Sequence, residues 1–411
     1  MKGLGFLPSV PLSCKASYLR TRCRPSSTSV APRRSQHCHT IALVSLDQES
    51  AQRVFEAVSP CRLEKLDGFG FLERAERLAS TREVPSYIIE NLKVWHKSYG
   101  IAVANNKDVK EDPNEYTEAM FSTLLELCRQ AIETPIDFSS YHQRIREPFD
   151  HYKFGFDFSS VLLNRSESSV IGIENVAEAE NYVKQGHNVI FLSNHQSEGD
   201  PYAIDVMLDW IAGCSREFCE DIVFMAGDRV RNDPMVSPFS AGRNLLTVYS
   251  KKHMNDQPEL REHKLMHNRR TISETQKLFK EGGQALWFAP SGGRDRRSEE
   301  MGSVQISSFD EGAVDMMKFT AMKSGKPFHF YPMALWTYDM LPPPTNVGGA
   351  KVGEERVAKY TPMHMYIGKE IDWSSAVPPD VTDKIGRRRA QCKYIEDIVI
   401  EGYRQIGGYE R

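Results

Sequence analysis

The feature that most constrains the fold of this chain is an alternation of short apolar runs with longer helical patterns that begins after Pro148. The apolar runs predict buried strands at 188–193, 222–226, 245–249, 285–289, 328–335 and 364–367. Helical patterns occupy several of the intervals, at 268–281, 310–323 and 380–406. Such alternation predicts an α/β domain whose mostly parallel central sheet is flanked by helices.

The segment that precedes this domain has a different pattern. Residues 47–147 show mainly helical periodicity, which is clearest at 114–133, where apolar residues recur every three or four positions. Pro113 precedes this stretch and Pro135 follows it, as expected at the limits of a helix. We therefore predict a small helical domain at 47–147, followed by the α/β domain at 148–411.

The first 46 residues differ again in composition. They contain seven Lys or Arg, many Ser and Pro, and no acidic residue before Asp47. An Arg- and Ser-rich segment without acids is typical of an organelle transit peptide. We therefore interpret residues 1–46 as a transit peptide, with a plain disordered tail as the alternative.

The distribution of charge restricts the possible partners. The whole chain carries −3 and residues 1–46 carry +7, so residues 47–411 carry −10. A net acidic body argues against nucleic-acid binding, which depends on neutralising phosphates. No apolar stretch approaches the roughly 18 residues of a membrane-spanning helix, so we also expect no transmembrane segment.

A first motif, NHQSEGDP, directly follows the predicted strand at 188–193. Asp followed by Pro201 marks a helix start, so the chain turns sharply between His195 and Asp200. A short turn can bring an imidazole into contact with a carboxylate, and such a pair forms a general base with an orienting partner. The alternative is that His195 is an ordinary polar residue and Asp200 only a helix cap.

Two further motifs contain basic residues, and each also follows a predicted strand. SKKHMND, at 250–256, contains Lys252 and His253, while APSGGRDRR, at 289–297, contains Arg294 and Arg296. Arginines two positions apart can bind a phosphate bidentately. Taken singly, the motif at 250–256 is also explained by a solvated charge run, and the motif at 289–297 by a basic surface loop.

The three motifs together indicate one site. Ligands bind at the carboxyl ends of the strands in parallel sheets, and each motif follows a strand. Residues 251–297 hold eleven Lys or Arg against six acids, although the body of the chain is acidic. A base beside a phosphate-binding cluster suggests deprotonation of a hydroxyl on a phosphorylated small molecule. We expect no metal at His263 and His267, because no Glu follows the first histidine as in zinc proteases.

At these motifs the sequence resembles the soluble, plastid-type glycerol-3-phosphate 1-O-acyltransferases. Their superfamily signature N-H-x-x-x-x-D is met by Asn194, His195 and Asp200, and SKKHMND, APSGGRDR and YPMALWTYDMLPPP are similar to this soluble branch in particular. Ser291 stands where membrane-bound relatives carry Glu. The resemblance extends from about 147 to 371, but residues 297–308 differ from the tryptophan-containing insert of land-plant members.

The resemblance implies transfer of a fatty acyl group from acyl-acyl-carrier-protein or acyl-CoA to the sn-1 hydroxyl of glycerol 3-phosphate, in the plastid stroma, without cofactor or metal. It makes His195 and Asp200 the catalytic pair. The phosphate-binding residues would be Lys252, His253, Arg294 and Arg296.

Three basic residues of the segment 261–281, namely Lys264, Arg269 and Arg270, could steer the docking of an acidic acyl-carrier protein.

Two alternatives to the main interpretation stay open at this point. One is an acyltransferase that acts on 1-acylglycerol 3-phosphate, and the other is a non-catalytic protein that binds phospholipid or acyl carrier.

Overall fold

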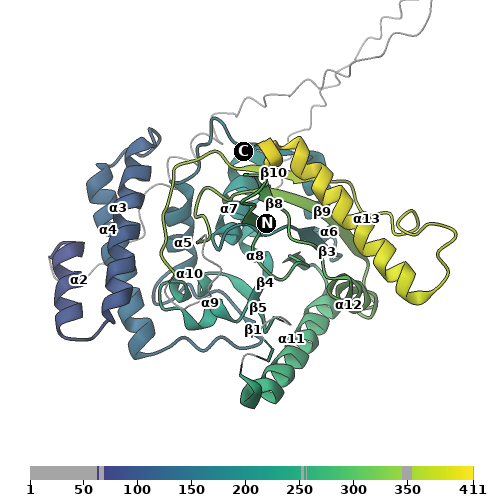
Figure 1. Cartoon of the computed structure of the whole chain (residues 1–411), viewed down its shortest axis with the longest axis horizontal. Coiled ribbons are helices and arrows are strands. Elements are labelled where there is room, and N and C mark those ends of the chain that lie inside the picture. The colour runs from purple at the N-terminus through teal and green to yellow at the C-terminus, as the bar shows by residue number, and fades with distance from the viewer. Residues whose placement is uncertain (1–62, 64–68, 251–253, 256, 345–353, 411) are drawn as a thin grey trace, which may run out of the picture. The chain divides into compact units, whose positions relative to one another are not determined.

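The computed structural model describes residues 63, 69–250, 254–255, 257–344 and 354–410. Its centre is an eight-stranded sheet with the order β1-β5-β4-β6-β3-β9-β10-β2 (Figure 1). The strands are β1 Tyr141–His142, β2 Ser169–Ile171, β3 Asn188–Ser193, β4 Val223–Gly227, β5 Asn244–Val248, β6 Ala285–Phe288, β9 Phe328–Trp336 and β10 His364–Ile367. The predicted α/β class with a mostly parallel sheet is therefore confirmed.

Strand β3 lies in the middle of this sheet, and all six of its residues are buried. It pairs in parallel with β6 on one side and with β9 on the other. Successive side chains point to opposite faces of a strand. Val189 and Phe191 accordingly pack in one apolar core, and Ile190 and Leu192 in a second. A strand buried on both faces needs a continuous apolar run, which is why the sequence pattern identified it.

Helices cover both faces of the sheet (Figure 1). One core contains residues of the helices between α2 and α8, and the other contains residues of α11, α12 and α13. The helices are α2 Phe71–Ser80, α3 Ser86–Asn105, α4 Pro113–Glu133, α5 His151–Ser160, α6 Ile173–Lys184, α7 Asp200–Met207, α8 Arg216–Asp221, α9 Arg229–Asn232, α10 Ser237–Ser240, α11 Arg261–Glu281, α12 Glu311–Met322 and α13 Lys384–Gln405.

The helical N-terminal segment forms around α4, as its periodicity predicted. The Asp112 carboxylate caps this helix by accepting hydrogen bonds from the backbone N–H groups of Asn114 and Glu115, and Pro113 is the first helical residue. Buried tyrosines connect the segment to α5, because the hydroxyls of Tyr99 and Tyr116 donate to backbone carbonyls of that helix. A separate domain at 47–147 stays a prediction.

The sequence did not indicate the short edge strands. Strands β1 and β2 have two and three residues, too few to show a period. The pairs β1–β5 and β9–β10 are antiparallel, unlike the rest of the sheet. A two-stranded hairpin, β7 Arg296–Arg297 with β8 Val304–Gln305, was also not predicted. Helix α11 begins at Arg261 rather than at 268, because its charged, mostly exposed first turns lack an apolar stripe.

Within the described residues, none of the helices combines the length and the hydropathy that crossing a membrane requires.

Candidate active site

The first and third motifs lie side by side at one edge of the sheet. They follow β3 and β6, which are neighbouring parallel strands, so their carboxyl ends meet at the same edge. The backbone N–H of Asp295 donates a hydrogen bond of 2.6 Å to the carbonyl of His195, which joins the two loops. Asp295 stands between Arg294 and Arg296. The structure thus brings the loop of the predicted base together with the loop of the predicted arginines.

His195 and Asp200 form the imidazole–carboxylate pair that their spacing predicted. Nδ1 of His195 lies 2.8 Å from Oδ2 of Asp200, the His195 side chain is 24% exposed, and that of Asp200 is fully buried. Because the carboxylate accepts the Nδ1 proton, Nε2 is the nitrogen of the neutral ring that can accept another. No described residue hydrogen-bonds to Nε2. The Trp287 ring packs edge-on against the imidazole, with centroids 5.6 Å apart.

Asp200 is not the helix cap that the alternative interpretation required. Gly199 is the N-cap of α7, and Asp200 is the first helical residue. Its carboxylate instead accepts hydrogen bonds from the backbone N–H groups of Gln196 and Ser197, at 2.8 and 3.0 Å. The hydroxyl of Thr337, just after β9, donates to the same carboxylate at 2.5 Å. These donors offset the cost of burying the charge and fix the carboxylate behind the imidazole.

A second buried carboxylate, Asp295, ties the two loops together. Its oxygens accept from the Asn194 side-chain amide and the Ser307 backbone N–H, both at 2.9 Å. Asn194 also donates to the carbonyl of Leu335 in β9 and accepts from its N–H. Burial raises the pKa of the Asp295 carboxyl group from 3.8 to about 7, against the lowering effects of these two hydrogen bonds and of His195.

Gln196 connects the loop of His195 to the C-terminal helix. Its side-chain oxygen accepts from the backbone N–H groups of Thr337 and Tyr338, at 2.9 and 3.2 Å. Its side-chain nitrogen donates to the hydroxyl of Tyr403 in α13, at 2.9 Å. Every polar group of the Gln196 side chain is therefore used to hold the loop, and the residue is fully buried.

Of the four predicted phosphate ligands, two lie in the described residues. Arg294 and Arg296 follow Gly292, whose φ of +63° is a conformation that L side chains rarely adopt. The Arg294 side chain is 10% exposed, and its Nη2 donates to both oxygens of Glu354, at 2.8 and 3.0 Å. Arg296 opens strand β7 opposite Gln305. Lys252 and His253 lie outside the described residues.

Sequence reasoning missed a buried arginine, Arg356, and the acids around it. Arg356 donates to both oxygens of Glu198 in the first motif and, at 3.0 Å, to Asp233. Burial alone would lower the pKa of its guanidinium, but these carboxylates raise it above its usual value. Arg356 lies in a segment without periodicity, so only tertiary structure reveals it.

The histidines of α11 have structural contacts. Nε2 of His267 lies 2.9 Å from the Thr247 hydroxyl and 3.0 Å from its carbonyl, and His263 is exposed. Across the described ranges, no group of three or more His, Cys, Asp or Glu could hold a metal ion. Lys264 corrects one expectation, because it is only 5% exposed and its ammonium lies over the Tyr249 ring. It cannot face a docking protein, whereas Arg269 and Arg270 are exposed.

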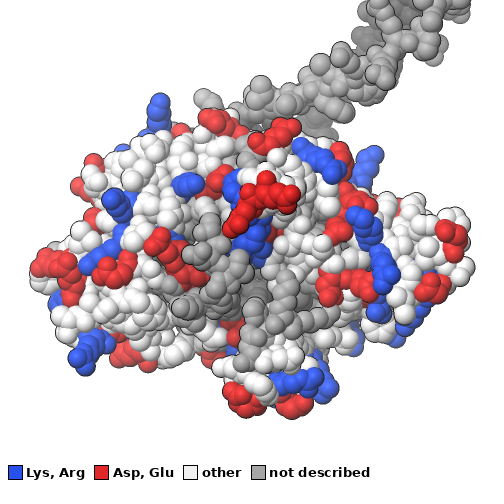
Figure 2. Space-filling view, in the orientation of Figure 1, with Lys and Arg blue, Asp and Glu red and all other residues white. Residues whose placement is uncertain are grey.

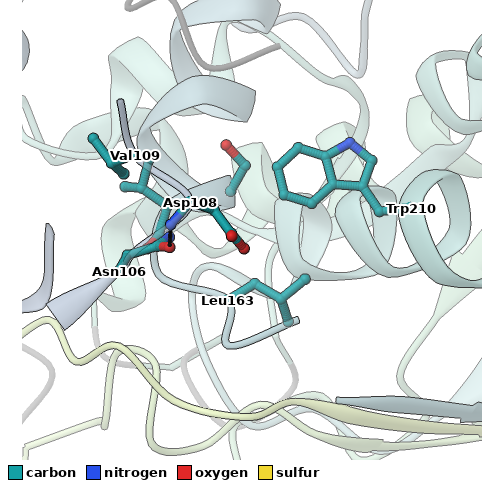
Figure 3. A pocket seen from close by; sticks show the side chains of 7 residues that line it. Asn106, Asp108, Val109, Leu163 and Trp210 are labelled. Carbon is teal, nitrogen blue, oxygen red and sulfur yellow. Dashed lines mark hydrogen bonds between the residues drawn. The ribbon is translucent and has the colours of Figure 1, made fainter. Parts of the chain in front are cut away.

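A small hollow elsewhere in the molecule offers no comparable chemistry. Figure 3 shows it between Trp210, Leu163 and the turn at Asn106 to Val109, with room for about one water molecule. Its one ionisable lining residue is Asp108, whose backbone N–H bonds to the Asn106 side chain. Neither a base nor an arginine lines it, so the loops after β3 and β6 remain the candidate site.

Comparisons with known proteins agree with this location. A family model described as Acyltransferase matches residues 170–336, a range that includes the His195 loop and the arginine loop. The chloroplastic glycerol-3-phosphate acyltransferase of Arabidopsis thaliana is 37% identical over 303 residues, which are 74% of this chain and 65% of that protein. The chloroplastic glycerol-3-phosphate acyltransferase ATS11 of Cucurbita moschata is 36% identical over 332 residues, 81% of this chain and 73% of that protein.

The alignment thus spans slightly less than two thirds of the Arabidopsis relative and about three quarters of the Cucurbita one. Among solved structures, the 1-acyl-sn-glycerophosphate acyltransferase PlsC from Thermotoga maritima aligns with a TM-score of 0.35 and 18% identity, over 82% of this chain and 95% of that chain. That likeness is too weak to support an argument. On the sequence matches, this chain belongs to the family of the chloroplastic glycerol-3-phosphate acyltransferases.

Proposed function

We propose that this chain transfers a fatty acyl group from a thioester carrier to the sn-1 hydroxyl of glycerol 3-phosphate, as the first step of phosphatidic acid synthesis in the plastid stroma. The donor is acyl-acyl-carrier-protein or acyl-CoA. The observation that carries this proposal is the 2.8 Å contact between His195 and Asp200 in a loop that hydrogen-bonds to the loop of Arg294 and Arg296. The names of the chloroplastic relatives support both the reaction and the compartment.

The proposed mechanism is direct transfer without an acyl-enzyme. Arg294 and Arg296, with Lys252 and His253, bind the phosphate and leave the sn-1 hydroxyl near Nε2 of His195. As Nε2 takes the hydroxyl proton, the hydroxyl oxygen attacks the thioester carbonyl carbon. Asp200 stabilises the imidazolium that forms. The carbon–sulfur bond then breaks, and the leaving thiolate receives the proton from the imidazolium.

The decisive experiment measures thiol release by purified residues 47–411 with glycerol 3-phosphate and either acyl donor. His195→Ala should lower kcat by roughly 10²- to 10⁴-fold, the usual contribution of general-base catalysis. The control is His263→Ala, which removes an exposed imidazole outside the site and should leave kcat unchanged. Unaltered turnover in His195→Ala would remove His195 from the mechanism.

The same assay tests the phosphate ligands. Arg294→Ala should raise the KM for glycerol 3-phosphate by roughly 10- to 150-fold, because a hydrogen bond to a charged group contributes about 1.5 to 3 kcal/mol. The matched control is Arg297→Ala, which removes an exposed arginine of the same segment. A change confined to the KM of the acyl donor would mean that the phosphate ligands are wrongly assigned.

The acceptor distinguishes the proposal from its two alternatives. Thiol release with 1-acylglycerol 3-phosphate but not with glycerol 3-phosphate would indicate the related acyltransferase reaction. Binding of glycerol 3-phosphate without thiol release from either donor would indicate a non-catalytic binding protein.

A further inference from the structure

The Arg294 guanidinium already forms an ion pair with a carboxylate of the chain itself. Nη2 of Arg294 donates to both oxygens of Glu354, at 2.8 and 3.0 Å, and each side chain is only 10% exposed. Nη1 of Arg294 lies 4.0 Å from a carboxylate oxygen of Glu198. The Arg294 guanidinium therefore lies between two carboxylates of the protein. The proposed function assigns this same guanidinium to the acceptor phosphate.

The acidic side chains around Arg294 make it unfavourable for a phosphate to bind while Glu354 is still paired with this arginine. Glu198, Glu354 and Asp233 surround the two guanidinium groups of Arg294 and Arg356 through close ion pairs. A phosphate that bound to Arg294 would approach the Glu354 carboxylate to within a few ångströms. In a poorly solvated site the repulsion between two such anions is strong, so the carboxylate must leave before the phosphate binds.

The position of Arg356 lets the Glu354 side chain leave while its backbone stays. Nη1 of Arg356 donates to the Glu354 backbone carbonyl at 2.9 Å, and the same guanidinium is held by Glu198 and Asp233. Arg356 is itself only 3% exposed. Because this contact holds the backbone at Glu354, rotation of the Glu354 side chain can free Nη2 of Arg294 without moving the main chain.

We propose that Glu354 is a specificity-determining residue whose carboxylate competes with the acceptor phosphate for Arg294. This inference rests on the proposed function, in which Arg294 binds that phosphate. A dianionic phosphate displaces the carboxylate, because its two negative charges attract the guanidinium more strongly than the single charge of Glu354. Singly charged anions, such as carboxylates, have no such advantage over Glu354 and are excluded. Glu354 thus raises the KM for the acceptor, and it makes the site selective for dianionic phosphates over singly charged anions.

The test compares Glu354→Gln with wild type, because the amide keeps the shape of the side chain and removes its charge. We expect the KM for glycerol 3-phosphate to fall by roughly 3- to 10-fold, a range between the loss of an exposed ion pair and the loss of a hydrogen bond to a charged group, while kcat changes less than about twofold. The inhibition constant of inorganic phosphate should fall by a similar factor. The control is Glu355→Gln, the exposed neighbouring glutamate, which should leave both constants unchanged.

A role for Glu354 in positioning Arg294 predicts the opposite result. An unchanged or increased KM in Glu354→Gln, at an unchanged melting temperature, would overturn the proposal. If the amide variant does not fold, Glu354→Asp provides the second test, since its shorter carboxylate reaches Arg294 less well and should lower the same KM.

Calorimetric titration with inorganic phosphate separates this inference from the proposed function. It measures competition between phosphate and Glu354 whether or not any acyl transfer occurs. If Arg294→Ala does not weaken phosphate binding, the proposed phosphate ligand is wrong. If Arg294→Ala weakens binding but Glu354→Gln does not strengthen it, only the competition by Glu354 is wrong.

Discussion

At the scale of single residues, the site depends on buried acids that have different tasks. Asp200 and Asp295 are both fully buried, within two loops joined by one backbone hydrogen bond. Asp200 accepts from two backbone N–H groups, the Thr337 hydroxyl and His195, and these contacts fix it behind the imidazole. Asp295 accepts from one backbone N–H and one amide, and burial dominates, so its pKa rises to about 7.

The raised pKa of Asp295 makes stability depend on pH. The carboxyl group titrates near 3.8 in the unfolded chain and near 7 in the folded protein, so the folded protein binds more protons between these values. Its contribution to the free energy of unfolding is therefore fully present below about pH 3.8 and is lost as the pH rises through about 7.

We predict that Asp295→Asn removes this pH dependence. The free energy of unfolding of wild type minus that of the variant should decrease between pH 5 and pH 8, because only wild type loses a bound proton. Urea denaturation of both proteins at the two pH values measures the difference. A difference that stayed constant, or grew with pH, would show that the Asp295 carboxyl group is already ionised at pH 5.

At the scale of secondary-structure elements, helix α13 supports the loop of His195, although the two are far apart in the sequence. It packs in the same core as Ile190 and Leu192 of β3, and its Tyr403 hydroxyl accepts from Gln196. The hydroxyl also donates to the carbonyl of Val304 in β8, at 3.3 Å. One buried hydroxyl thus joins the C-terminal helix, the hairpin after the arginine loop and the loop of His195.

We predict that Tyr403→Phe lowers both stability and turnover. Removing the hydroxyl leaves the buried Gln196 amide without this partner, which costs about 1 to 3 kcal/mol. The loop of His195 should then be less ordered, so kcat should fall several-fold while the KM for glycerol 3-phosphate changes little. Thermal unfolding and steady-state kinetics provide the measurements.

Tyr394→Phe is the control, since Tyr394 lies on the same helix and is only half-buried. Equal effects of the two substitutions would mean that Tyr403 contributes only packing.

At the scale of the whole molecule, an acidic partner can be attracted only by local groups of basic residues, because the net charge is negative. Residues 47–411 carry −10, and Figure 2 shows basic and acidic side chains intermixed over the visible face rather than gathered into one large patch. Acyl-carrier proteins are acidic, so an acidic body repels them unless exposed basic residues lie where they dock. Of the three α11 residues proposed to steer the carrier, Lys264 is buried, whereas Arg269 and Arg270 are exposed.

We predict that Arg269→Glu with Arg270→Glu raises the KM for acyl-acyl-carrier-protein by about 10-fold, and more at low salt, because exposed charges interact through screened electrostatics. The KM for acyl-CoA, which lacks an extended protein surface, should change much less. Lys277→Glu, an exposed position two turns further along α11, is the control. If the KM values for both donors changed equally, the two arginines would act on something other than carrier docking.

Features formed by residues close together in the sequence could be predicted, whereas contacts between distant residues could not. The strands at 188–193 and 364–367 were predicted with the observed limits, because burial on both faces requires an apolar run. The pair of His195 and Asp200 was predictable because both residues lie in one turn. Arg356 and Glu354 were not, because their partners Glu198 and Arg294 are distant in sequence. The burial of Lys264 depends likewise on contact with Tyr249, which helical spacing does not reveal.

The pair of His195 and Asp200 is held largely by the N–H groups of Gln196 and Ser197, which lie between its two members. The two members of the proposed base pair thus come together within six consecutive residues, and Thr337 adds one hydrogen bond to Asp200 from a distant strand end. The proposed phosphate-binding half instead combines separate parts of the chain, around positions 294 and 354. A protein built in this way can exchange one acceptor for another by altering remote loops, without rebuilding its base.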